Sequence, residues 1–184
     1  GESTSAIHLT KAFVRGKLKN YRYSLLKSQR MRSEIDLNNG LNQLHTTIKS
    51  LETANTIDSI RGYEGAGSAA YFGCFDKLIM NENFSFKIRN RRPPLDPVNS
   101  LLSLGYSLLR HDIQSAINIV GFDPYLGYLH TQRYGRPSLA LDLMEEFRPL
   151  IVDSVVLKAI NRRFLTPQDF IVELDLNPCR LTSW

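Results

Sequence analysis

Apolar positions along most of the chain recur three or four residues apart, which is the spacing that places side chains on one face of an α-helix. The first such segment runs from about residue 5 to residue 28. Its apolar positions are Val14, Leu18, Tyr21 and Leu25. The next segment, interrupted or tightened at Asn39-Gly40, has its apolar positions at Ile35, Leu41, Leu44, Ile48 and Leu51. Both patterns predict amphipathic helices.

Two further helices are marked by residues that favour helix starts. Thr56 is a suitable N-cap for a helix from about 57 to 80. That helix contains four glycines, and each costs up to ~1 kcal/mol relative to alanine, which indicates close helix packing or close approach of a ligand. Asp96 as N-cap and Pro97 in the first turn fit the start of a helix that ends at Gly121. Its apolar positions have few polar interruptions, so we expect this helix to be central.

The last predicted helix runs from about 139 to 163 and has Ser138 as its expected N-cap. Pro149 lies inside this stretch and should kink it or split it in two, because proline lacks the N–H of the helical hydrogen bond and clashes with the preceding turn. The chain shows no alternation of parallel strands with helices. We therefore expect an all-α fold, with residues 1–184 forming one helical domain.

Composition excludes several classes of protein. The chain has 184 residues and is 42% hydrophobic, which is enough apolar material for a core and excludes an intrinsically disordered chain. No apolar run approaches the ~18–20 residues that span a bilayer, so no membrane segment is expected. Cys74 and Cys179 lie far apart and form no Cys-x-x-Cys motif, which argues against a disulfide scaffold or a cysteine-rich zinc site and fits the cytoplasm.

The net charge of +5 is unevenly distributed along the chain. Eight basic residues and no acidic residue lie between Lys11 and Arg32. Four more lie beside Pro93-Pro94: Lys87, Arg89, Arg91 and Arg92. Segregated basic patches attract polyanions. The first run fits the solvated face of a helix equally well, whereas the second lies in a connector and favours contact with nucleic acid.

Four residues could carry chemistry. Glu64 lies between glycines, and His130 precedes a basic segment. Asp142 and Glu145 are three residues apart and so share one face of a helix. Each of these residues could instead have an ordinary structural role, and Arg148 is a credible ion-pair partner for Asp142 and Glu145. Together, two carboxylates and an imidazole suit Mn²⁺ or Mg²⁺, and basic residues around such an ion indicate a phosphodiester substrate.

Two other hypotheses compete with this one. The dyad His111-Asp112 is typical of HD phosphohydrolases, but that chemistry needs further His and Asp ligands on other helices. His8 and His45 are available for this role, but they lie in unremarkable sequence contexts. A helix-turn-helix regulator could use the basic first helix, but it would leave His130 and the acidic face without a role.

Four motifs follow one another along the chain, at residues 61–66, 91–106, 121–130 and 138–149. With the segment 17–20 they resemble the Cas one family of CRISPR-associated spacer integrases, over about residues 11 to 181. Four motifs in this order are highly specific, whereas any one of them alone would not be.

The resemblance implies a mostly helical catalytic domain. Its metal ligands would be Glu64, His130 and Glu145, with Asp142 as a supporting catalytic acid and Mg²⁺ or Mn²⁺ as the cofactor. Members of the family carry an N-terminal β-rich domain that helps to form their dimer. The chain is therefore expected to be the catalytic domain of a longer polypeptide, to form a homodimer and to work with a Cas two partner protein.

The reaction implied by the resemblance is DNA transesterification, in which 3′-hydroxyl ends of a protospacer are joined to the CRISPR repeat. The expected contacts to the DNA backbone, independent of base sequence, are Lys87, Arg89, Arg91, Arg92, Arg133 and Arg136. The alternative from another class is a non-catalytic helical DNA-binding module. Finding Glu64, His130 and Glu145 far apart in the fold would favour that alternative.

Overall fold

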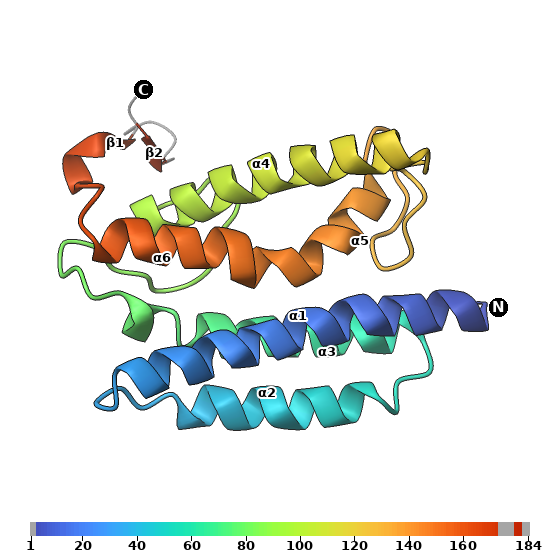
Figure 1. Ribbon diagram of the computed structural model, residues 1–184, viewed down its shortest axis with the longest axis horizontal. Coiled ribbons are helices and arrows are strands. Elements are labelled where there is room, and N and C mark those ends of the chain that lie inside the picture. Colours follow the sequence, from blue (N-terminus) through green and yellow to red (C-terminus); the bar gives the residue numbers. More distant parts are fainter. Residues whose placement is uncertain (1–2, 173–178, 182–184) are drawn as a thin grey trace.

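The protein, described here from a computed structural model for residues 3–172 and 179–181, is a stack of helices (Figure 1). The helices are α1 (Thr4–Met31), α2 (Asn38–Leu51), α3 (Ile57–Phe72), α4 (Pro97–Val120), α5 (Ser138–Phe147) and α6 (Ser154–Asn161). In the stack, α4 lies at one side, followed by the run from α5 to α6, then by α1 beside α3, and finally by α2. The all-α prediction is confirmed.

A small strand pair accompanies the helices at the C-terminal end of the described residues. The strands β1 (Phe170–Val172) and β2 (Cys179–Leu181) are antiparallel, with Phe170 opposite Leu181. None of the described helices is both long enough and apolar enough to cross a membrane.

The predicted helix starts agree with the structure at α3 and α4. The Thr56 hydroxyl accepts a hydrogen bond from the backbone N–H of Ser59, and the Ser59 side chain in turn accepts one from the N–H of Thr56. Asp96 accepts from the N–H of Asn99 at 2.8 Å, with Pro97 in the first turn of α4. That helix ends at Gly121, whose φ of 88° lies in the left-handed region that glycine adopts readily.

The predicted split at Pro149 is confirmed. Helix α5 ends at Phe147, a π-helical segment covers Arg148–Asp153, and α6 follows. The missing N–H of proline removes one bond from the α-helical ladder, and the wider turn accommodates that loss.

Three expectations are wrong. Helix α3 ends at Phe72 rather than near residue 80, because the chain turns at Gly73 and so buries Phe75 fully against the rings of Phe72 and Phe86. Ser138 lies inside the first turn of α5 and does not cap it; its hydroxyl donates to the carbonyl of Thr131 at 3.2 Å instead. Helix α4 lies at the edge of the stack, and its Leu108 is 57% exposed.

The central helix is α1, which packs against α2, α3 and α5. Its predicted apolar positions are all buried: Val14, Leu18, Tyr21 and Leu25. The ring of Tyr21 stacks on that of Tyr71 from α3, with the centroids 3.9 Å apart. Aromatic stacking of this kind fixes the relative position of the two helices.

The connector between α4 and α5, which carries His130, is held tightly against α5. The N–H of Leu139 donates to the carbonyl of Pro124 at 2.9 Å, and Leu129 is buried. Gly127 allows the closest approach, because a Cβ added there would lie 2.5 Å from the Cβ and 2.6 Å from the carbonyl carbon of Ser138. A side chain at position 127 therefore requires the connector to move away from α5.

We predict that Gly127→Ala lowers the free energy of unfolding by ~1–3 kcal/mol, the usual cost of overpacking. Gly62→Ala is the matched control, because a Cβ at Gly62 meets no atom within 4 Å and alanine favours the helix by up to ~1 kcal/mol. Urea unfolding followed by circular dichroism measures both variants. A Gly127→Ala protein as stable as the parent would show that the connector does not need this close approach.

Candidate active site

The residues with predicted chemistry converge from three parts of the chain. Glu64 comes from α3, His130 from the connector before α5, and Asp142 and Glu145 from α5 itself. Between Glu64 and Glu145 lies Lys17 of α1, whose ammonium contacts Glu64 Oε1 and lies 2.6 Å from Glu145 Oε2. The lysine side chain is 1% exposed. Residues far apart in sequence thus meet around one buried cation.

Asp142 organises His130. Its carboxylate is fully buried and accepts hydrogen bonds from the backbone N–H groups of Tyr128 at 2.6 Å, Leu129 at 2.9 Å and His130 at 2.9 Å. The same carboxylate lies 2.7 Å from His130 Nδ1. A carboxylate on Nδ1 keeps the proton on that nitrogen and leaves Nε2 as the free ligand atom. The Nε2 atom faces Glu145, 3.9 Å from its Oε1.

Glu145 is paired on both sides. Its Oε1 lies 3.0 Å from a guanidinium nitrogen of Arg148, and its Oε2 faces Lys17. Burial alone would raise the pKa of Glu145, but the charges of Lys17 and Arg148 lower it to about 2. Burial likewise acts to lower the pKa of Lys17, but the charges of Glu145, Tyr21 and Glu64 outweigh burial, so the pKa is raised. Both groups are therefore ionised at neutral pH.

The two acids on the shared helix face thus have separate partners. Asp142 turns to the connector and His130, whereas Glu145 turns to Lys17 and Arg148. The pairing with Arg148 that the sequence left open is confirmed for Glu145.

Arg148 continues into a buried polar network behind the site. Its guanidinium lies over the ring of Tyr106, 4.8 Å from the centroid. The Tyr106 hydroxyl donates to Asp153 Oδ1 at 2.6 Å. Burial raises the pKa of Asp153 to about 6, although the hydroxyls of Tyr106 and Tyr71 act to lower it. This network anchors the π-helical segment to α4.

Lys17 is the site residue that the sequence reasoning missed. By charge it belongs to the basic run of the first helix, although it lies among the apolar positions Val14, Leu18 and Tyr21. A lysine on a buried helix face needs an acidic partner. The place of Lys17 on the apolar face of the helix is therefore the sequence feature that could have pointed to a buried ion pair.

The donor types of the site fit a divalent ion. Glu64, His130 and Glu145 offer two carboxylates and one imidazole. Ligand atoms about 2.1 Å from one Mg²⁺ lie at most ~4.2 Å apart, and the 3.9 Å between His130 Nε2 and Glu145 Oε1 is within that span. As they stand in residues 3–172 and 179–181, no three His, Cys, Asp or Glu side chains form a ready metal site. Between Glu64 and Glu145 lies the Lys17 ammonium.

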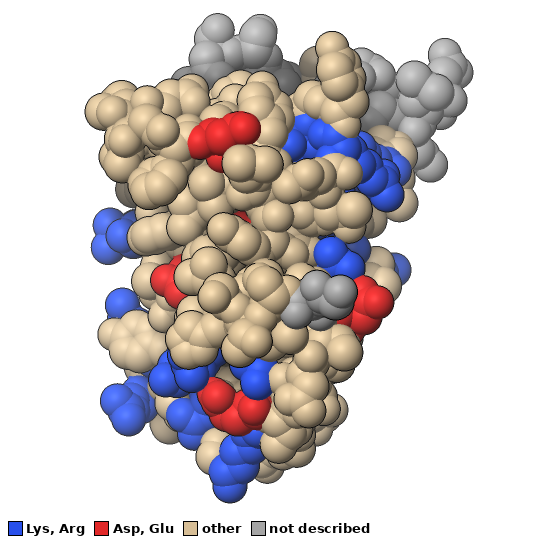
Figure 2. All heavy atoms as spheres, turned by 90° about the vertical axis from the view of Figure 1, so that its right-hand side faces the viewer, with Lys and Arg blue, Asp and Glu red and all other residues tan. Residues whose placement is uncertain are grey.

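A basic cavity of about 780 Å³ opens beside His130. Five of the six expected DNA contacts line it: Arg89, Arg91, Arg92, Arg133 and Arg136. Two arginines that the sequence reasoning did not assign to DNA, Arg110 and Arg148, line it as well. On the face shown in Figure 2, Lys and Arg side chains gather in patches rather than spreading evenly.

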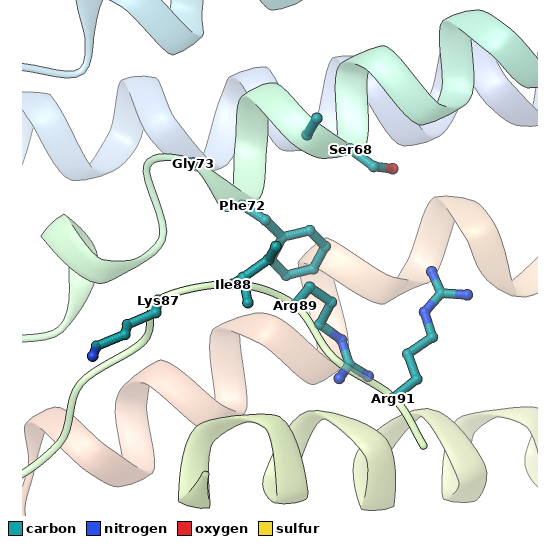
Figure 3. A pocket seen from close by; sticks show the side chains of 8 residues that line it. Ser68, Phe72, Gly73, Lys87, Ile88, Arg89 and Arg91 are labelled. Atoms are coloured by element: carbon teal, nitrogen blue, oxygen red, sulfur yellow. The ribbon is translucent and has the colours of Figure 1, made fainter. Parts of the chain in front are cut away.

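Lys87 lies apart from this cavity. It lines a neighbouring hollow of about 450 Å³, together with Phe72 and Arg91 (Figure 3). In this view Arg91 points from the segment before α4 toward α3, whereas Lys87 points away from the ring of Phe72. Arg89, at the border of both spaces, is held by protein partners, since it donates to Asn99 Oδ1 at 2.7 Å and to Ser103 Oγ at 3.2 Å. Arg91 and Arg92 are exposed.

Comparison with known proteins identifies the family. The family model for CRISPR associated protein Cas1 matches residues 1–183. The chain belongs to the Cas1 family. This membership decides against the HD phosphohydrolase and helix-turn-helix hypotheses.

The Cas1 relatives include proteins of known name and structure. CRISPR-associated endonuclease Cas1 3 of Thermus thermophilus is 46% identical over 169 residues, which cover 92% of this chain and 48% of that protein. The chain thus spans about half the length of that relative. A chain of a partial Cas6-RT-Cas1–Cas2 complex superposes with a TM-score of 0.89 at 31% identity, covering 99% of this chain and 55% of the other. A casposase bound to its integration product gives 0.84 at 29% identity, covering 98% and 50%.

Proposed function

We propose that the chain is the metal-dependent integrase and endonuclease domain of CRISPR adaptation, which joins 3′-hydroxyl ends of a spacer to the CRISPR repeat by transesterification. The observation that carries this proposal is the convergence of Glu64, His130 and Glu145, with His130 lining a basic cavity. The endonuclease relative and the casposase bound to an integration product support it.

Glu64, His130 and Glu145 would hold the ion, Mg²⁺ or Mn²⁺. When bound, the ion neutralises charge at the scissile phosphate and stabilises the leaving 3′-oxygen. Asp142 positions the imidazole, because its contact with Nδ1 leaves Nε2 directed at Glu145. Arg148 lines the cavity and also touches Glu145, so it connects the metal ligands with the bound DNA.

The arginines of the cavity would bind DNA phosphates. Arg91, Arg92 and Arg133 are exposed and free to reach a backbone that passes His130. In the reaction, the spacer 3′-oxygen forms a new bond to phosphorus, the bond to the repeat 3′-oxygen breaks, and the proton of the attacking hydroxyl passes to the leaving oxygen through solvent. With water as the nucleophile, the same site cuts DNA.

Partners follow from the same proposal. We expect a homodimer and a Cas2 partner protein acting in the cytoplasm, and the structural relative from a Cas6-RT-Cas1–Cas2 complex supports the Cas2 partner. The alternative of a non-catalytic DNA-binding module is disfavoured, because the three proposed ligands lie around one point rather than far apart.

We predict that Glu145→Gln lowers Mn²⁺-dependent strand transfer more than ~100-fold, since it removes a charged ligand and not merely a supporting group. Duplex binding should stay near that of the parent. Glu146→Gln is the control, because it makes the same change one position along, outside the proposed ligand set. Full strand transfer by Glu145→Gln, in a protein whose fold is verified by circular dichroism, would remove Glu145 from the metal site.

The basic cavity gives a second prediction. Replacing Arg91 and Arg92 together by glutamine should flatten the plot of log affinity for duplex DNA against log salt concentration, by roughly 1.8 if each arginine contacts one phosphate. Fluorescence anisotropy at several salt concentrations measures the slope. Lys158→Gln with Arg162→Gln, at the end of α6 and outside the lining of the basic cavity, should leave it unchanged. An unaltered slope in the first variant would exclude this pair from the interface.

A further inference from the structure

Lys17 is a charged residue that lies in the buried interior of the fold. Its side chain is 1% exposed, and its ammonium contacts Glu64, Glu145 and, at 5.5 Å, the ring face of Tyr21. An ammonium buried this deeply is costly unless it is paired. The ammonium in turn stabilises the two carboxylates, because without a cation between them they would repel each other.

The charges of this cluster balance before any metal ion arrives. Glu64 and Glu145 carry two negative charges, and Lys17 and Arg148 carry two positive charges. Asp142 stands apart, since its charge is shared among three backbone N–H groups and His130. A divalent ion that joined the four groups with Lys17 in place would leave a surplus of two positive charges in a buried site, which is unfavourable.

The direction of approach is set by exposure. Glu64 and His130 are 25% and 23% exposed, whereas Glu145 and Lys17 are 3% and 1% exposed. An ion entering from solvent therefore reaches Glu64 and His130, the more exposed groups, and meets the ammonium before it can engage both carboxylates.

We propose that Lys17 is a built-in counter-cation that competes with the divalent ion for Glu64 and Glu145, so that the site binds metal weakly until a DNA phosphate offsets the surplus charge. This inference rests on the proposed metal site. It makes metal and DNA binding mutually reinforcing, because a favourable coupling between two ligands acts equally on both. Without DNA, a free divalent ion therefore binds weakly and does not activate the nuclease.

The test measures Mn²⁺ affinity rather than activity. The probe is Mn²⁺ alone, titrated into the full chain and followed by the electron paramagnetic resonance signal of the free ion. Lys17→Met removes the charge and keeps an unbranched apolar side chain. It should bind Mn²⁺ ~10-fold more tightly or better, and a short DNA duplex should then raise the affinity less than it does in the parent. Lys19→Met, on the exposed side of the same helix, is the matched control and should match the parent.

The competing explanation is that Lys17 serves the fold alone. In that case Lys17→Met would lower the unfolding temperature but bind Mn²⁺ no more tightly than the parent, and the inference would be overturned. If Mn²⁺ binding is lost in Glu145→Gln while Lys17→Met leaves it unchanged, only the role of Lys17 fails. If neither the parent nor Lys17→Met binds Mn²⁺, the proposed metal site fails with it.

A measurement on the parent chain covers the case in which Lys17→Met does not fold. The side-chain methylene signal of Lys17, assigned with Lys17→Arg in protein labelled at lysine Cε, is followed by NMR during a titration with Mg²⁺. Displacement of the ammonium should shift this signal in step with binding, and Glu64→Gln should suppress the shift. A Lys17 signal that stays constant while Mg²⁺ binds would overturn the inference.

Discussion

The contact of the Lys17 ammonium with Glu64 and Glu145 is the interaction on which the rest of the structure depends. It joins α1, α3 and α5 at one buried point, so none of the three helices can shift without leaving a charge unpaired in the interior. Breaking such a pair costs several kcal/mol, about as much as a large part of the net stability of a domain. The ion cluster therefore sets the relative positions of the helices, and it also sets where the carboxylates lie.

Two further sets of contacts hold the segments around this ion cluster in place. Asp142 binds three backbone N–H groups and the imidazole of His130, which holds the connector between α4 and α5 against α5. The network from Arg148 through Tyr106 to Asp153 fixes the π-helical segment that follows Pro149. Acidic ligands, a positioned imidazole and an arginine-lined cavity thus meet at one edge of the helical stack, which is the combination that metal-assisted chemistry on a phosphodiester needs.

Much of the fold could be predicted because local chemistry determines it: the capping box at Thr56, the cap at Asp96 and the break at Pro149 act within a few residues. The end of α3 and the edge position of α4 depend on contacts with distant parts of the chain, such as the burial of Phe75 against Phe86, and periodicity alone does not contain them. The convergence of Glu64, His130 and Glu145 came from the family resemblance, since no spacing rule joins residues so far apart. Lys17 was read as surface charge because charge counts ignore which face of the helix a residue occupies.

We infer that Glu64, His130 and Glu145 hold one divalent ion in the place where Lys17 now pairs the carboxylates. Anomalous diffraction from crystals of the chain grown with DNA and Mn²⁺ tests it most directly. We predict a manganese peak within about 2.5 Å of a carboxylate oxygen of Glu64, a carboxylate oxygen of Glu145 and His130 Nε2, with the Lys17 ammonium withdrawn from between the acids. A peak elsewhere, or Lys17 unmoved between two metal-free carboxylates, would contradict it.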